Sequence, residues 1–101
     1  MSINKTLQLP CGVEVKNRFL KSAMTEGIAN SDALANNRHV NLYERWAKGG
    51  TGISITGNVQ IDHRFIERDG NVVIEGTQTN KSLAALANWS QAGKQNNTQL
   101  W

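Results

Sequence analysis

The chain alternates between two sequence periods, and this alternation restricts its fold more than any other feature. Apolar residues at every second position on both sides of a Pro-Cys-Gly turn indicate a hairpin within residues 6–19. Residues 19–24 and 53–56 read as further strands, whereas 38–50 and 80–97 carry apolar residues at helical spacing. Strands that alternate with helices are typical of a parallel sheet, so the predicted class is α/β, either an open doubly wound sheet or a barrel.

The first predicted helix follows Asn36 or Asn37, either of which can cap it. Its apolar stripe is widened by Trp46 and comprises Val40, Tyr43 and Ala47. The helix is expected to end at Gly49-Gly50, where a glycine can take the positive φ that terminates many helices. Gly49, Gly50 and Gly52 follow a helix and precede a strand, the reverse of the order in a phosphate-binding loop, so a helix stop and tight turn is the better interpretation.

The second predicted helix has Asn80 as its N-cap and ends near Gly93. Its apolar side is expected to comprise Leu83, Leu86, Ala87 and Ser90. Between the two helices, residues 62–76 are predicted to form a long functional loop in which 71–74 could be a short strand. Residues 98–101 look like the opening of another strand.

Composition excludes several classes of protein. A chain of 101 residues has room for one small domain, and its net charge of +3 comes from scattered residues, which argues against a nucleic-acid partner. Cys11 is the single cysteine, so an internal disulfide and a thiolate metal cluster are excluded. No apolar segment is long enough to span a bilayer, and we expect a soluble, cytoplasmic protein without a membrane partner.

Three polar residues are of types that can bind a metal ion or another ligand. His39 and His63 have no second histidine or carboxylate at metal-ligand spacing, so no metal site is predicted; His39 is placed in the first turn of its helix and His63 in a solvated loop. Lys21 either faces a polar barrel interior or contacts a ligand, and the first is preferred. In both α/β architectures, ligands bind where strands end, at Ala23, Met24, Thr25 and Gly57.

Two spaced motifs carry a family resemblance. VEVKNRFLKSAMTEG at 13–27 and YERWAKGGTGISITGNVQI at 43–61 resemble the N-terminal part of the old yellow enzyme family of NADH:flavin oxidoreductases. That family has Lys-Asn-Arg at the start of its first barrel strand, Pro-Met-Thr or Pro-Met-Cys at its end, and Tyr-x-x-Arg-Ala-x-Gly-Gly at the end of the following helix. Here Ala23 replaces the proline, and Trp46 stands between Arg45 and Ala47. The loop 62–76 is similar to that of a subgroup of NADH oxidases.

The resemblance implies a fold and an activity. Residues 1–101 would be the N-terminal fragment of a single FMN-binding (β/α)₈ TIM-barrel domain: an N-terminal β-hairpin, two strand–helix units and the start of a third strand. The parent would be an ene-reductase or NADH oxidase that passes a hydride from NAD(P)H through FMN to a small-molecule acceptor, an electron-poor alkene or similar compound.

Individual residues take roles from the same resemblance. Ala23 and Met24 would line the flavin, Thr25 would hydrogen-bond its carbonyl edge, and a side chain at Gly57 would collide with the ring. Gln99 lies at the wrong end of its strand to be the family's flavin-binding glutamine, and the catalytic residues are expected beyond Trp101. The fragment alone is expected to be inactive, to bind no FMN, and either to self-associate through exposed sheet edges or to stay partly unfolded. The alternative is a small stand-alone α/β binding module without flavin.

Overall fold

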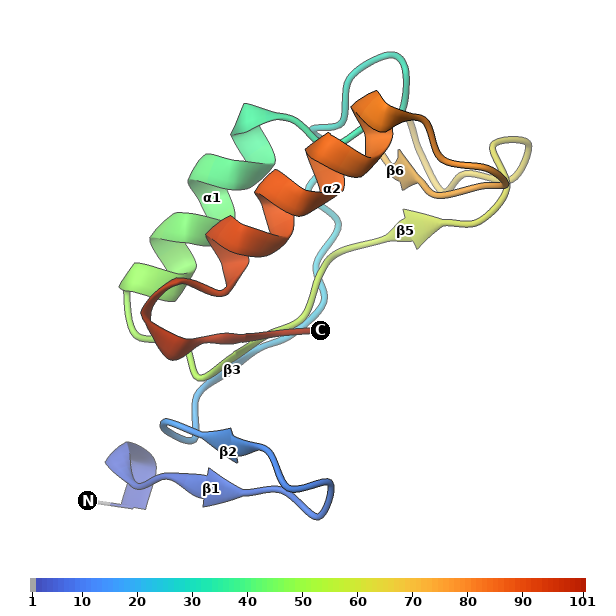
Figure 1. Ribbon diagram of the computed structural model, residues 1–101. Helices are drawn as coiled ribbons and strands as arrows, with labels where there is room; N and C mark the ends of the chain where they lie inside the picture. The colour runs from blue at the N-terminus through green and yellow to red at the C-terminus, as the bar shows by residue number, and fades with distance from the viewer. Residues whose placement is uncertain (1) are drawn as a thin grey trace.

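The computed structural model describes residues 2–101 and shows short strands joined to two longer helices (Figure 1). The helices are α1 (Asn37–Lys48) and α2 (Asn80–Gly93), and 3₁₀ turns span Ser2–Asn4 and Gln95–Asn97. The strands are β1 (Leu7–Gln8), β2 (Glu14–Val15), β3 (Leu20–Lys21), β4 (Ile53–Ser54), β5 (Val59–Gln60), β6 (Val72–Val73) and β7 (Gln99–Leu100).

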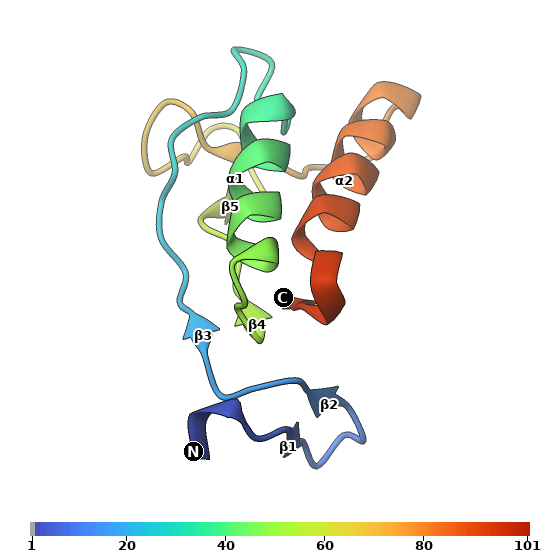
Figure 2. The same cartoon turned by 90° about the vertical axis from the view of Figure 1, so that its left-hand side faces the viewer.

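The strands form three small sheets. β1 and β2 make the predicted antiparallel hairpin, β3, β4 and β7 make a parallel sheet in that order, and β5 pairs in parallel with β6. Helix α1 connects β3 to β4, and α2 lies between β6 and β7 in the chain; the two helices run side by side (Figure 2). The described residues are therefore an open segment of a (β/α) barrel with a hairpin in front, as the sequence predicts.

The strand register separates the two faces of the parallel sheet. Leu20, Ile53 and Gln99 are partners across the sheet, and Lys21, Ser54 and Leu100 form the next row. Because successive side chains of a strand point to opposite faces, each row lies on one side. A Cβ at Gly93 of α2 would lie 2.7 Å from the Leu100 side chain, so the second row faces the helices.

Lys21 differs from its prediction. Its ammonium group lies 4.6 Å from the ring centroid of Trp46 and 5.2 Å from that of Tyr43, and it donates a hydrogen bond to the carbonyl of Ile55. The side chain therefore lies between the sheet and α1, not in the barrel interior. Its long apolar stem can cover the helix while the charge meets aromatic faces and a carbonyl, which is why a lysine is tolerated there.

Helix α1 forms as predicted. Asn36 accepts a hydrogen bond from the backbone of Arg38, and the N-cap and His39 form a capping box, so the Asn36 alternative is confirmed. Tyr43 and Ala47 are fully buried, in agreement with the predicted stripe. Gly50, with φ of +109°, supplies the positive φ after the helix.

Helix α2 is rotated relative to its prediction. Leu83 and Ala87 are exposed, and the buried side comprises Ser82, Trp89, Ala92 and Gly93. Trp89 decides the orientation, because its large ring packs 5.4 Å from that of Tyr43 and buries more area than a leucine would. The N-cap is Thr79, whose side chain accepts from the Ser82 backbone, and not Asn80.

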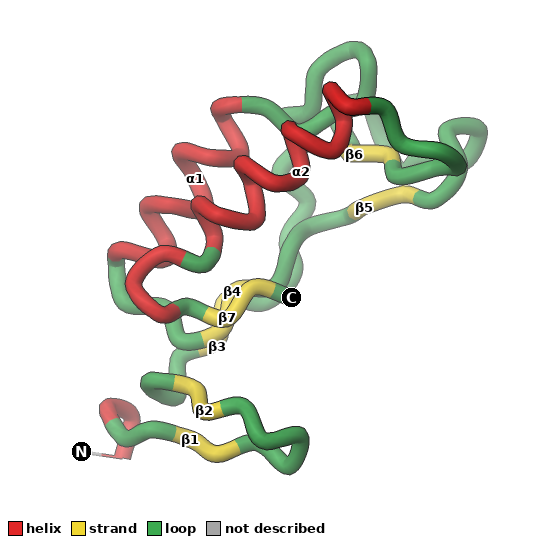
Figure 3. Tube along the Cα trace, viewed as in Figure 1, coloured by secondary structure: helices red, strands yellow, loops and turns green. Residues whose placement is uncertain are grey.

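The segment between β4 and α2 is mostly loop, as expected, but it is more structured than its polar sequence indicates (Figure 3). The predicted short strand is present as β6, whereas its partner β5 was not predicted. Val72 of β6 is buried in one cluster with Ala35, Tyr43 and Trp89, which ties this segment to both helices. Neither described helix is long and apolar enough to cross a membrane.

We propose that the chain expressed alone self-associates through its open sheet. Strands β3 and β7 are sheet edges, and Leu20 of β3 and the preceding Phe19 are each 51% exposed. Sedimentation velocity of the 101-residue chain should show dimers or larger species. Leu20→Lys should shift the distribution toward monomer, whereas Leu83→Lys, at a similarly exposed position on α2, should not. A monodisperse monomer for the unmodified chain would contradict the proposal.

Candidate functional site

The predicted ligand-binding residues lie where β3 and β4 end. The two strands are parallel with Leu20 opposite Ile53, so four residues further on Met24 comes level with Gly57. Their proximity is direct, since a Cβ built on Gly57 would overlap the carbonyl oxygen of Met24. The structure therefore brings Met24 and Gly57 together, with Ala23 and Thr25 on either side of Met24 in sequence.

Gly57 is required by this chain's own atoms. A side chain there would overlap the Glu26 carboxylate as well as the Met24 carbonyl. The sequence-based expectation was that a side chain would collide with a flavin ring; the contacts in the structure give a different and sufficient reason for glycine. The small residue lets the two strand ends approach each other.

Tyr43 of α1 joins the two strand ends. Its fully buried hydroxyl accepts a hydrogen bond of 3.0 Å from the Gly57 N–H and donates one to a carboxylate oxygen of Glu26. Sequence reasoning placed Tyr43 in the apolar stripe of its helix and gave Glu26 no role. The available signal was the tyrosine hydroxyl itself, because a buried Tyr O–H usually finds a hydrogen-bond partner.

Glu26 is the negative charge of this polar cluster. Burial raises the pKa of Tyr43 above its usual value, and the hydrogen bond to Glu26 raises it further. Burial lowers the pKa of Lys21 and of His39, and in both cases the Glu26 charge opposes that change. The protonated Tyr43 hydroxyl is therefore available as a donor to Glu26 at neutral pH.

The backbone at Ala23–Thr25 is open to a ligand. Ala23 is exposed, Met24 is 48% exposed and Thr25 is half-buried. Within residues 2–101, the N–H groups of these three residues donate no main-chain hydrogen bond. Main-chain donors without a main-chain partner beside an apolar side chain suit the edge of a flat heteroaromatic ring, so the residues present fit a flavin.

Other candidate residues lie elsewhere. Gln99 pairs with Ile53, four residues before the level of Gly57, which agrees with its exclusion from the ligand-binding end. His39 is buried in the first turn of α1, with its ring 4.9 Å from that of Trp89. His63 is exposed as predicted, but folding brings it next to Glu75, a neighbour that local sequence spacing does not reveal.

The structure is part of a parallel (β/α) barrel. This follows from the strand order, from the helices on one face of the sheet and from the candidate site at the strand ends.

No family model matches the chain. The NADH-dependent flavin oxidoreductase iliE of Hypocrea jecorina (strain QM6a) is 34% identical over 93 residues, which are 91% of this chain and 23% of that protein. The chain thus spans about a quarter of this relative's length.

Solved structures give the same result for the fold. A 2-naphthoyl-CoA reductase complex aligns with a TM-score of 0.86 at 17% identity, over 98% of this chain and 14% of that one. Old yellow enzyme from Pichia sp. AKU4542 aligns with a TM-score of 0.81 at 18% identity, over 98% of this chain and 25% of that one. Together these matches confirm the resemblance to the old yellow enzyme family that the two motifs predict.

The raised pKa of Tyr43 can be tested directly, because Tyr43 is the only tyrosine. A pKa raised by folding means that the stabilising contribution is complete below the unfolded value of about 10 and is lost as pH rises through the folded value. Absorbance at 295 nm should show half-ionisation near pH 10 in urea. In the native chain, tyrosinate should appear at higher pH, together with loss of helical circular dichroism.

Tyr43→Phe provides the control for this titration, since it removes the tyrosinate signal entirely. Native Tyr43 that ionises near pH 10 with the helices intact would show that its hydroxyl is not buried against Glu26.

Proposed function

We propose that this chain is the first part of a flavin-dependent oxidoreductase whose complete domain is a (β/α)₈ barrel. Residues 1–101 would supply the hairpin, two strand–helix units and the start of the third strand. The observation that carries the proposal is the meeting of Met24 and Gly57 at the ends of two adjacent parallel strands, the place where barrel enzymes bind their ligands. The names of the sequence relatives support a flavin and NADH.

The proposed cofactor is FMN, held against Ala23, Met24, Thr25 and Gly57. When bound, it would supply hydride transfer from NAD(P)H to an electron-poor alkene or similar small molecule. The N–H groups of Ala23–Thr25 would hydrogen-bond the edge of the ring, and the exposed part of Met24 would cover apolar ring atoms.

Thr25 has the most specific proposed role in this site. A hydroxyl donor that points at the carbonyl edge of the ring stabilises negative charge as it develops there on reduction. Tyr43 and Glu26 would act as positioning residues that do not themselves touch the flavin, because they fix Gly57 and the chain that follows Thr25. Residues that touch the substrate would come from the rest of the barrel, so the 101-residue chain alone would not turn over.

Thr25→Ala in the complete protein tests this role. Loss of the hydroxyl donor should lower the reduction potential of the bound flavin and slow its reduction by NAD(P)H by roughly 10- to 1000-fold. Thr25→Ser keeps a hydroxyl and should retain most of the wild-type potential.

Ser22→Ala is the matched control, since it removes a hydroxyl from an exposed position three residues earlier. Spectroscopic titration against a redox dye measures the potential, and stopped-flow absorbance measures the rate of reduction. If Thr25→Ala leaves both quantities at their wild-type values, Thr25 does not contact the flavin.

A further inference from the structure

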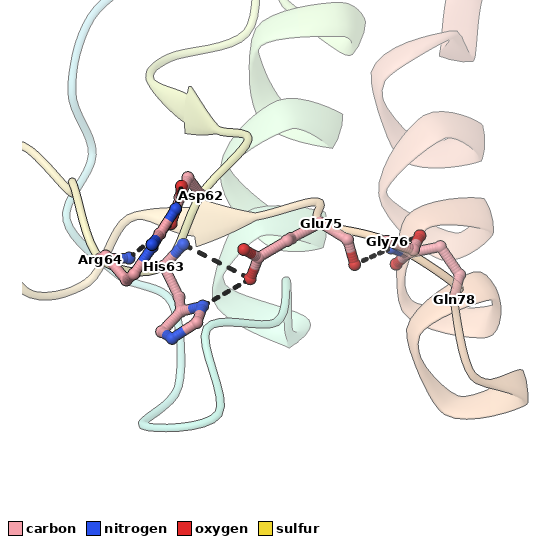
Figure 4. A network of polar contacts seen from close by, with 6 residues as sticks. All are labelled: Asp62, His63, Arg64, Glu75, Gly76 and Gln78. Carbon is pink, nitrogen blue, oxygen red and sulfur yellow. Dashed lines mark hydrogen bonds and ion pairs between the residues drawn. The ribbon is translucent and has the colours of Figure 1, made fainter.

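Asp62 and His63, which are adjacent in sequence, meet the distant Glu75 beyond the ends of β5 and β6 (Figure 4). The parallel register sets Gln60 opposite Val73, and the Ile74 N–H continues the pairing with a 2.8 Å hydrogen bond to the Gln60 carbonyl. Two residues further along each strand, Asp62 comes level with Glu75. The backbone pairing of β5 and β6 therefore places this cluster.

The ligand atoms of the three side chains lie close to one another. One ligand atom each from Asp62, His63 and Glu75 lies within 4.8 Å of the other two, and His63 Nδ1 is 2.5 Å from Glu75 Oε2. Ligands bonded about 2.0–2.2 Å from one Zn²⁺ lie at most roughly 4.4 Å apart. The side chains of His63 and Glu75 are 69% and 38% exposed, so small rotations can bring the ligand atoms to bonding distance.

Neighbouring groups hold the two acidic ligands in position. Gln78 donates to the Glu75 carbonyl at 3.2 Å, which fixes the backbone where β6 ends. Arg64 donates from Nε and Nη2 to the two oxygens of the Asp62 carboxylate, at 3.0 and 2.7 Å. Oδ1 also accepts a hydrogen bond of 3.0 Å from the Arg64 backbone N–H, so the second lone-pair site of Oδ2 is the one that Asp62 can offer to a cation.

We propose that Asp62, His63 and Glu75 form a surface site for a divalent transition-metal ion, with Zn²⁺ the best match. An imidazole with two carboxylates favours zinc over calcium or magnesium, which prefer oxygen ligands alone. Three protein ligands leave the remaining coordination position to water, as in open zinc sites. The site is separate from Met24 and Gly57 and is independent of the flavin proposal.

Calorimetric titration of the full chain with Zn²⁺ tests the site. The wild-type chain should bind one ion in a saturable manner, and His63→Gln and Glu75→Gln should each weaken binding at least 10-fold. Glu67→Gln is the matched control, because it removes an exposed carboxylate from the same loop but outside the cluster. It should bind Zn²⁺ with wild-type affinity.

Arg64→Gln distinguishes coordination of Zn²⁺ by Asp62 from a general attraction of cations to acidic groups. It removes the positive charge that competes for Asp62, so it should tighten Zn²⁺ binding through Asp62, and this gain should disappear in the Arg64→Gln, Asp62→Asn double variant. Far-UV circular dichroism checks that the variants keep the helices. Zn²⁺ binding that does not saturate would overturn the proposal. An affinity for Zn²⁺ that His63→Gln leaves unchanged would also overturn it, because the ion would then be bound elsewhere, for example by His39 in unfolded chains.

Discussion

The hydrogen bonds of one buried hydroxyl determine how the two strand ends meet. Tyr43 accepts from the Gly57 N–H and donates to Glu26, so a single α1 side chain satisfies polar groups that follow both β3 and β4. A buried N–H left without a partner costs about 1–3 kcal/mol, a large part of the stability of a domain this small. The contact also fixes Gly57 beside Met24, so the same interaction holds the fold together and shapes the proposed flavin-binding edge.

The strand register extends this constraint to the rest of the molecule. Leu20, Ile53 and Gln99 form one row and the next row faces the helices, and the proposed ligand-binding end lies beyond Lys21 and Ser54. The two helices pack against each other through Tyr43 and Trp89, whose rings lie 5.4 Å apart. The same two residues bury Val72 of β6, which positions the loop that carries His63.

Much of this arrangement could be predicted from the sequence, because periodicity and capping are local. The hairpin, both helices and the existence of β3 and β4 follow from local patterns, although the two strands end at Lys21 and Ser54, earlier than predicted, and the sequence did not decide between Asn36 and Asn37 as the cap. The rotation of α2 could not, since it depends on Trp89 meeting a tyrosine from another helix. Neither the link from Glu26 to Tyr43 nor the cluster at His63 could be predicted, because each joins residues more than ten positions apart.

We propose that the strand ends held by Tyr43 and Glu26 form one edge of a flavin site. Amide hydrogen exchange of the complete protein, with and without FMN, tests it most directly. FMN should slow exchange at Ala23, Met24 and Thr25 and leave exchange within α1 unchanged. Equal exchange at those three amides in the two states, with protection elsewhere showing that FMN is bound, would contradict it.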